Sequence, residues 1–370
     1  MPDAMEETSF LAGLAAAVST LAQREVPGKV AYDDVVQRAY NHFVLRTLVE
    51  DDFRTPGSVP EMIEIIADRP VQDWLPGSTS ETVLLHGDTF SPTQECIELV
   101  VDNRRDPFGE KYENEILKLA LSACQEADSP ESYVAFRRLL ITRPALTQTE
   151  LVLQRGELDL LPVADLLDRC YLPVSPRLRR ERQYAECARC HCLLRPVGRD
   201  SWQCDLDRCR TTTVKVRRYL DATVPGGILQ LGLPLRTFVT GPGLFEIDLE
   251  IALGKRGLAV EMWPGYDAYD LLVTFPDKIR WAVDVKDYAN PGVLGRTFAG
   301  LPSTPPRDRG FLVVPDYRRS ANKQYAESFR YARQSAGRSS DSLSVTFQKD
   351  FLRAVDRKLT STTALEGPNA

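Results

Sequence analysis

The chain contains 370 residues, of which 43% are hydrophobic and 26% are charged, and its formal net charge is −6. These proportions are ordinary for a globular protein and exclude a fibrous or low-complexity chain. No apolar run approaches the roughly 20 residues that cross a membrane, and the acidic first residues are unlike a secretory signal. We therefore expect a cytoplasmic protein with no membrane contact, long enough for two or three domains.

Residues 1–175 are predicted to form an α-helical domain that acts as a scaffold or binds a partner. Apolar residues recur at helical spacing throughout this part, and the Ser-Pro pairs at Ser91 and Ser129 are typical of helix starts. A winged-helix-like DNA-binding unit around 131–175 is the alternative interpretation. The expected helices are 10–24, 33–50, 59–68, 93–103, 110–127, 131–141, 147–155 and 160–170.

Residues 176–220 hold five of the eight cysteines and are predicted to form a zinc ribbon. Two cysteines separated by two residues are followed, thirteen residues later, by two separated by four. Two close pairs with a hairpin-sized gap are typical of a closed, structural four-thiolate Zn²⁺ site. His191 and Cys192 lie beside the first pair, and either could replace a ligand. The predicted zinc ligands are Cys187, Cys190, Cys204 and Cys209.

The same region is basic although the chain is acidic. Residues 177–218 contain twelve basic and five acidic residues, a net charge of +7, so the rest of the chain carries −13. A local basic patch favours contact with phosphates more than the total charge does. A solvated, salt-bridged surface is the alternative explanation. The candidate nucleic-acid-binding residues are Arg177, Arg179, Arg180, Arg217 and Arg218.

Residues 221–360 are predicted to form an α/β domain, followed by a disordered tail over 361–370. A helix is expected at about 243–256, then strands near 258–263, 269–275 and 280–286. The apolar run 311–314 ends at Pro315 and is typical of a buried strand. A helix over 321–333, a strand over 343–347 and a helix over 350–359 complete the domain.

Asp270, Asp284 and Lys286 are the candidate catalytic residues of this domain. Side chains alternate faces along a strand, so Asp284 and Lys286 share a face. Two carboxylates can hold a hard cation, and a neighbouring amine can position a hydroxide for phosphodiester cleavage. An Asp-x-Lys pair alone is more often an exposed salt bridge.

The order of elements, with Asp270 on one strand and Asp284-x-Lys286 on the next, resembles the PD-(D/E)xK restriction-endonuclease-like superfamily. Phe245-Glu246, followed eleven residues later by Gly257, resembles the Mrr-like members, in which the equivalent glutamate joins the active site. The proline of the superfamily name is missing beside Asp270. The expected fold is therefore multidomain α+β, with a helical N-terminal domain, a central zinc ribbon and a C-terminal α/β restriction-endonuclease-like core.

This resemblance implies a role for each residue. Asp270 and Asp284 would bind Mg²⁺ or Mn²⁺ together with the carbonyl of Val285, and Lys286 would orient the hydroxide. Glu246 would bind the metal through water or bind a second metal.

Three further acids are candidates near this site. Glu250 lies one helical turn after Glu246 and is its substitute candidate. Asp267 and Asp287 are additional candidates that we expect instead at the surface.

More closely, the layout resembles the restriction-endonuclease-like proteins associated with prokaryotic PIWI-RE defence modules. That resemblance implies a PIWI-RE protein and a helicase as partners. We expect an endonuclease acting on DNA, with RNA or an RNA/DNA hybrid open as substrates, and a homodimer would allow both strands of a duplex to be cut. The alternative is a non-cleaving adaptor that uses the ribbon and the nuclease-like fold to bind DNA or a partner.

Overall fold

A computed structural model describes residues 4–23, 32–48, 52–102, 110–338 and 345–365. The chain forms two compact units, each built from two segments. Unit 1 comprises Met1–Glu115 and Pro173–Val224, and unit 2 comprises Ile116–Leu172 and Pro225–Ala370. The boundaries predicted at 175/176 and 220/221 stay predictions, and the units group these segments differently. None of the helices in the described ranges is long and apolar enough to cross a membrane.

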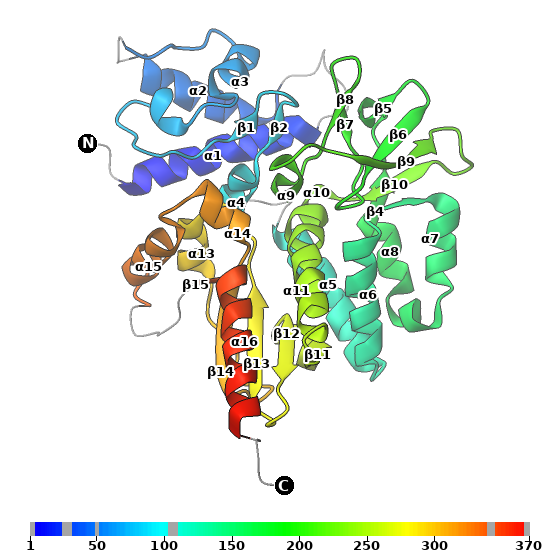
Figure 1. Ribbon diagram of the computed structural model, residues 1–370. Helices are drawn as coiled ribbons and strands as arrows, with labels where there is room; N and C mark the ends of the chain where they lie inside the picture. The colour runs from blue at the N-terminus through cyan, green and yellow to red at the C-terminus, as the bar shows by residue number, and fades with distance from the viewer. Residues whose placement is uncertain (1–3, 24–31, 49–51, 103–109, 339–344, 366–370) are drawn as a thin grey trace. The chain divides into compact units, whose positions relative to one another are not determined.

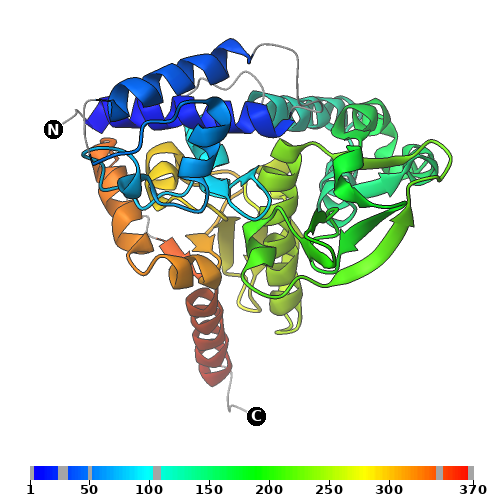
Figure 2. The ribbon, with the colours of Figure 1, turned by 90° about the horizontal axis from the view of Figure 1, so that it is seen from above.

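The first segment of unit 1 is helical, as predicted. Helices α1 (Ala4–Gln23) and α2 (Asp34–Thr47) lie side by side (Figure 1, Figure 2). Their contact includes aromatic rings, with Phe10 of α1 at 4.8 Å from His42 and 6.4 Å from Phe43 of α2, between ring centroids. The segment also contains α3 (Val59–Ile66), the short pair β1 (Leu85–His86) and β2 (Ser91–Pro92), and α4 (Gln94–Asp102).

The second segment of unit 1 contains the cysteines. Strands β5 (Arg179–Arg180), β6 (Gln183–Cys187) and β9 (Val216–Asp221) form one antiparallel sheet. Strands β7 (Arg195–Val197) and β8 (Ser201–Gln203) form the hairpin expected between the cysteine pairs, and helix α9 (Asp207–Arg210) carries the last cysteine.

The first segment of unit 2 has the element order of a winged helix. After α5 (Glu110–Glu126), which spans the unit boundary, come α6 (Pro130–Thr142), β3 (Ala145–Thr147), α7 (Gln148–Arg155), α8 (Ala164–Cys170) and β4 (Tyr171–Pro173). Strand β10 (Ile228–Leu231) lies between β3 and β4 in one three-stranded sheet. The cysteine-containing segment lies between β4 and β10 along the chain, which is the position of the wing loop in a winged helix. This topology agrees with the winged-helix interpretation of 131–175, whose DNA binding stays a prediction.

The rest of unit 2 is built on a five-stranded sheet in the order β11-β12-β13-β14-β15. Strands β11 (Ala259–Met262), β12 (Leu271–Thr274) and β13 (Arg280–Val285) are antiparallel, and β14 (Arg309–Val314) and β15 (Val345–Phe347) continue in parallel. Helix α11 (Gly241–Gly254) precedes the sheet, where a helix was predicted over 243–256. The predicted strands are confirmed, although residues 343–344 of the last one lie outside the described ranges.

The two faces of this sheet are covered by different helices. On one face, Trp281 and Phe311 pack against Phe351 of α16 (Gln348–Leu365). On the other, Leu312 and Val314 pack against α13 (Pro291–Thr297) and α15 (Tyr325–Ser335). Asp284 pairs in register with Leu312 on this second face.

Three details of the C-terminal domain differ from expectation. Helix α13 was not predicted. The helix predicted over 321–333 is α15, which begins only at Tyr325 because the backbone is extended at Asn322, and a separate helix, α14 (Asp316–Ala321), precedes it. Helix α16 continues to Leu365, five residues into the segment expected to be a disordered tail, and residues 366–370 lie outside the described ranges.

Candidate active site

Asp270, Asp284 and Lys286 come together at the ends of two neighbouring strands. Asp270 directly precedes β12, and Asp284 lies near the end of β13, which pairs with β12. The backbone N–H of Val285 donates to Asp270 Oδ2 at 2.6 Å. The ammonium of Lys286 contacts Asp284 Oδ1 and lies 3.8 Å from Asp270 Oδ2, so both carboxylates face one cation. Both are almost fully buried, at 6% and 9% exposed.

Glu246, rather than Glu250, faces this group from α11. Glu246 is 2% exposed, and its Oε2 accepts hydrogen bonds from Trp263 Nε1 at 2.6 Å and from Arg137 Nη2 at 3.3 Å. Glu250 instead pairs with Arg138 at 2.6 Å. Burial raises the pKa of Glu246, and the nearby charge of Arg137 partly offsets that rise.

Arg137 of α6 is the central residue that sequence reasoning missed. Its Nη1 donates to Asp267 Oδ2 at 2.8 Å, and its Nη2 lies 3.3 Å from Glu246 Oε2 and 4.0 Å from Asp270 Oδ1. The guanidinium also lies over the Trp263 ring, 5.2 Å from the centroid. Burial alone would lower the pKa of Arg137, but the surrounding carboxylates, Asp267 first, hold that pKa well above its ordinary value.

Close packing of two helices brings Arg137 to the acids. A Cβ placed at Gly243 of α11 would fall far inside van der Waals contact with the Ile141 side chain of α6. Only glycine therefore permits this approach. Thr240, just before α11, donates from its hydroxyl to the Leu140 carbonyl at 2.9 Å.

Asp267, expected at the surface, belongs to this cluster. It accepts hydrogen bonds from Arg137 and, at 2.8 Å, from the Tyr133 hydroxyl of the same helix. It ends a turn, 263–267, in which four of the five residues have positive φ, from 48° for Trp263 to 71° for Asp267. Left-handed backbone is uncommon for residues other than glycine and concentrates at functional sites. This turn brings the Trp263 ring and the Asp267 carboxylate against Arg137, while the indole N–H of Trp263 donates to Glu246.

Asp287 is also not a surface acid. It is 4% exposed, and Arg318 Nε donates to its Oδ1 at 2.7 Å. The Tyr317 hydroxyl donates to the same carboxylate. Because Arg318 is itself 4% exposed, this pair is a buried structural ion pair of α14 rather than a ligand set.

The charges of the site favour a bound cation. Four carboxylates, those of Glu246, Asp267, Asp270 and Asp284, surround two basic side chains. Burial, followed by the charge of Glu246, raises the pKa of Asp270 well above its ordinary value. Burial would lower the pKa of Lys286, but Asp284 and Asp270 outweigh this effect and raise it. Carboxylate and carbonyl oxygens are the donors that Mg²⁺ and Mn²⁺ take, so the donor set at Asp270, Asp284 and Val285 fits such an ion.

Unit 1 contains the four-cysteine cluster that the sequence predicted. The Sγ atoms of Cys187, Cys190, Cys204 and Cys209 all lie within 4.8 Å of one another, and all four residues are buried. Tetrahedral zinc–sulfur bonds of about 2.3 Å place sulfurs about 3.8 Å apart, and two of the pairs lie at 3.4 and 3.9 Å. The donor set therefore fits a closed Zn²⁺ site without His191 or Cys192.

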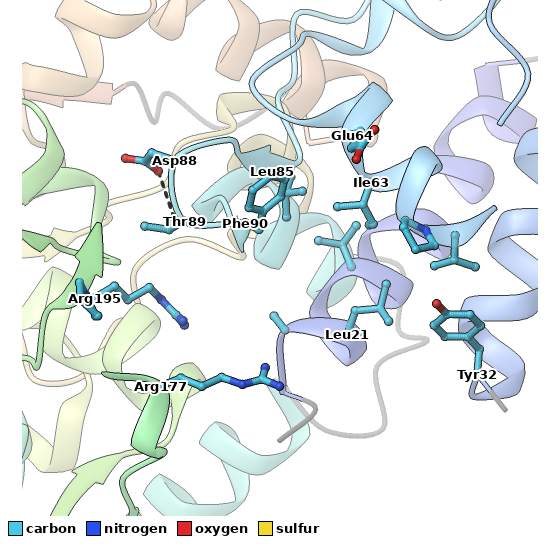
Figure 3. A pocket seen from close by; sticks show the side chains of 15 residues that line it. Leu21, Tyr32, Ile63, Glu64, Leu85, Asp88, Thr89, Phe90, Arg177 and Arg195 are labelled. Atoms are coloured by element: carbon cyan, nitrogen blue, oxygen red, sulfur yellow. Dashed lines mark hydrogen bonds between the residues drawn. The ribbon is translucent and has the colours of Figure 1, made fainter. Parts of the chain in front are cut away.

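The candidate nucleic-acid-binding arginines have unlike surroundings. Arg217 and Arg218 each lie 2.6 Å from the buried carboxylate of Glu186. Arg180 stacks on Trp202, with its guanidinium carbon 4.6 Å from the ring centroid. Arg177, by contrast, points into a pocket of about 580 Å³ within unit 1 (Figure 3). Arg195 reaches the same pocket, whose other wall is largely apolar.

Two family comparisons match separate parts of the chain. Residues 243–363 match the family described as the REase associating with pPIWI_RE. Residues 10–147 match the pPIWI_RE three-gene island domain Y. The chain is a pPIWI-RE-associated restriction-endonuclease-like protein. No curated protein and no solved structure matched it.

The residues of the candidate active site of this restriction-endonuclease-like protein fall in both matches. Glu246, Asp270, Asp284 and Lys286 lie in the endonuclease match, whereas Arg137 lies in the domain Y match. The four cysteines lie between the two matched ranges. Helix α6 thus belongs to domain Y by sequence and to unit 2 by structure.

Proposed function

We propose that this protein is a metal-dependent endonuclease that hydrolyses DNA phosphodiester bonds within a pPIWI-RE module. One observation carries the proposal: Asp270, Asp284 and Lys286 converge on one buried point, with Glu246 in the same cluster. A buried acid cluster around a lysine has little structural value, because burying charges costs more than an apolar core would. Strongly shifted pKa values in such a cluster favour a functional site.

Each of these side chains would have a different role in phosphodiester hydrolysis. Asp270, Asp284 and the carbonyl of Val285 would hold Mg²⁺ or Mn²⁺, and Glu246 would reach the ion through water or bind a second one. A bound ion supplies a water of lowered pKa and neutralises phosphate charge. The ammonium of Lys286, already between two carboxylates, would position the attacking water and stabilise charge developing on the phosphoryl oxygens.

Nucleic acid would be recruited by the basic part of unit 1. Arg177, Arg179 and Arg180 are the candidate phosphate contacts, and the Zn²⁺ site would fix β6, which pairs with the strand of Arg179 and Arg180. The family description names association with pPIWI_RE, so a pPIWI-RE protein is the proposed partner. A helicase is a further proposed partner, which rests only on the resemblance of the layout to PIWI-RE modules. A DNA duplex or a hybrid fits this setting, and a second copy of the chain would supply the second cut.

Plasmid cleavage in Mg²⁺, with and without the pPIWI-RE partner, tests the proposal. We expect Asp284→Ala and Lys286→Ala to lower the cleavage rate by about 10²–10³-fold, because each removes an interaction of several kcal/mol with the transition state. Glu261→Ala and Lys255→Ala, at exposed positions of the same domain, serve as controls and should cut normally.

Two outcomes would contradict the proposal. Equal cleavage by the Asp284 and Lys286 variants would remove this site from consideration. DNA binding without cleavage, in the presence of the partner, would identify the chain as a non-cleaving adaptor.

A further inference from the structure

Arg137 occupies a distinctive position among the acids of the site. Its Nη2 lies between two carboxylates, 3.3 Å from Glu246 Oε2 and 4.0 Å from Asp270 Oδ1. Asp270 thus presents one oxygen to Arg137 and the other to the Val285 N–H and Lys286. The two sides of one carboxylate face two different cations.

The surroundings hold the guanidinium firmly in this place. The side chain is 7% exposed and carries a bidentate set of contacts, with Nη1 on Asp267 and Nη2 on Glu246. The planar fork and the ring of Trp263 suit arginine and not lysine. Removing the charge would leave several buried carboxylates without compensation, which explains why a residue from α6 is held there.

A second metal ion would need this same position. In two-metal nuclease sites the ions lie about 3.5–4 Å apart, and here a carboxylate shared between them would be Asp270. Asp270 and Asp284 would hold the first ion, and the Lys286 ammonium, whose side chain is 30% exposed, would move aside to admit it. The second would have to lie between Asp270 and Glu246, where the Arg137 guanidinium already lies, and one oxygen of Glu246 is also bonded to the Trp263 indole.

We propose that Arg137 is a built-in cation that replaces the second metal, so that the active site binds a single divalent ion on Asp270 and Asp284. Glu246 then acts by holding Arg137, and it does not ligate a second ion. This inference rests on the proposed function, since it concerns the metal at that site. It also gives α6 of domain Y a direct role in the charge of the nuclease centre.

Counting bound Mn²⁺ on the full zinc-loaded chain, by electron paramagnetic resonance and calorimetry, tests the proposal. We expect one Mn²⁺ per wild-type chain, and one for Arg137→Lys, which keeps a positive charge near the acids. Arg137→Met should bind two, and the double variant Arg137→Met/Glu246→Gln should return to one. Arg138→Met, on the neighbouring arginine that pairs with Glu250, is the matched control and should bind one.

A second variant covers the case in which Arg137→Met fails to fold. Glu246→Gln in the wild-type background should still bind one Mn²⁺, with its affinity changed less than about threefold, whereas Asp284→Asn should bind none. Two ions in the wild type, or loss of the ion in Glu246→Gln, would overturn the proposal. Mn²⁺ binding that survives both Asp270→Asn and Asp284→Asn would instead overturn the proposed function.

Discussion

The cysteine cluster of unit 1 and the acid cluster of unit 2, both proposed as metal sites, are assembled in different ways. The cysteine cluster of unit 1 comes from 23 consecutive residues, Cys187 to Cys209. The acid cluster of unit 2 joins α6 to residues 109 and 130 positions further along the chain, Glu246 and Asp267. The first offers four thiolates to one Zn²⁺ ion in a closed site. In the second, the basic side chains of Arg137 and Lys286 already supply part of the positive charge that the acids need.

Removing zinc should have the largest effect on stability, because few other long-range contacts hold a site that is built from one short stretch of chain. Structural zinc contributes about 10–16 kcal/mol in small domains. We expect the double variant Cys187→Ser/Cys204→Ser to lose one zinc per chain and to unfold the ribbon segment, as measured by metal analysis and limited proteolysis between 176 and 220.

Cys192→Ser is the control for this experiment, since Cys192 is buried beside the cluster but is not among its four ligands. It should keep the zinc. Loss of zinc from this variant would show that the ligand set differs from the one described.

Replacing either of two neighbouring acids of unit 2, Asp287 or Asp284, with alanine should have different effects on stability and on cleavage. Asp287→Ala leaves Arg318 buried without its partner, which should lower the free energy of unfolding by about 3–5 kcal/mol. Asp284→Ala removes one of several crowded carboxylates and should change stability far less, while lowering the cleavage rate by about 10²–10³-fold. Urea unfolding followed by tryptophan fluorescence measures both, and a similar loss in the two variants would contradict the separation of a structural acid from a functional one.

The parts of the site that local spacing determines could be predicted from the sequence. The cysteine pairs, and Asp284 two residues before Lys286, are short-range patterns whose geometry follows from a hairpin or a strand. Arg137 could not be found in this way, because its partners are more than 100 residues distant and an arginine in an amphipathic helix is ordinarily exposed. The one local signal is its position four residues after Tyr133, on the buried face of α6.

Asp267 and Asp287 were expected at the surface, and the reason why the sequence did not predict their actual surroundings is related. Asp287 follows the end of β13, where exposure is usual, and only the packing of Tyr317 and Arg318 from α14 buries it. Asp267 depends on a turn with left-handed residues that no propensity favours. Both outcomes are set by tertiary contacts, which a single sequence does not display.

The arginines of unit 1 should differ in their contribution to DNA binding. Arg177 points into a pocket, whereas Arg217 is held by the buried Glu186. We expect Arg177→Ala to lower the slope of log affinity against log salt by about 0.9, the effect of one phosphate contact. Arg217→Ala should change that slope less. Mobility shifts at several salt concentrations measure both, and equal slopes would indicate that Glu186 does not restrain Arg217.

The smallest expected effect is the slow chemical labelling of the buried thiols outside the zinc cluster. Burial raises the pKa of Cys96 in α4 and of Cys170 in α8 to about 12 in each case, with only partial offsets from Ser19 and Arg169. Only the thiolate reacts with maleimide or disulfide reagents, so at pH 8 about one molecule in 10⁴ is reactive at either position. Labelling should rise about tenfold per pH unit up to that pKa.

Zinc-depleted protein should expose fast-reacting thiols between 187 and 209, while Cys96 and Cys170 stay unlabelled, as peptide mass spectrometry would show. Rapid labelling of Cys96 at pH 8 in the folded chain would mean that α4 opens far more readily than its burial implies.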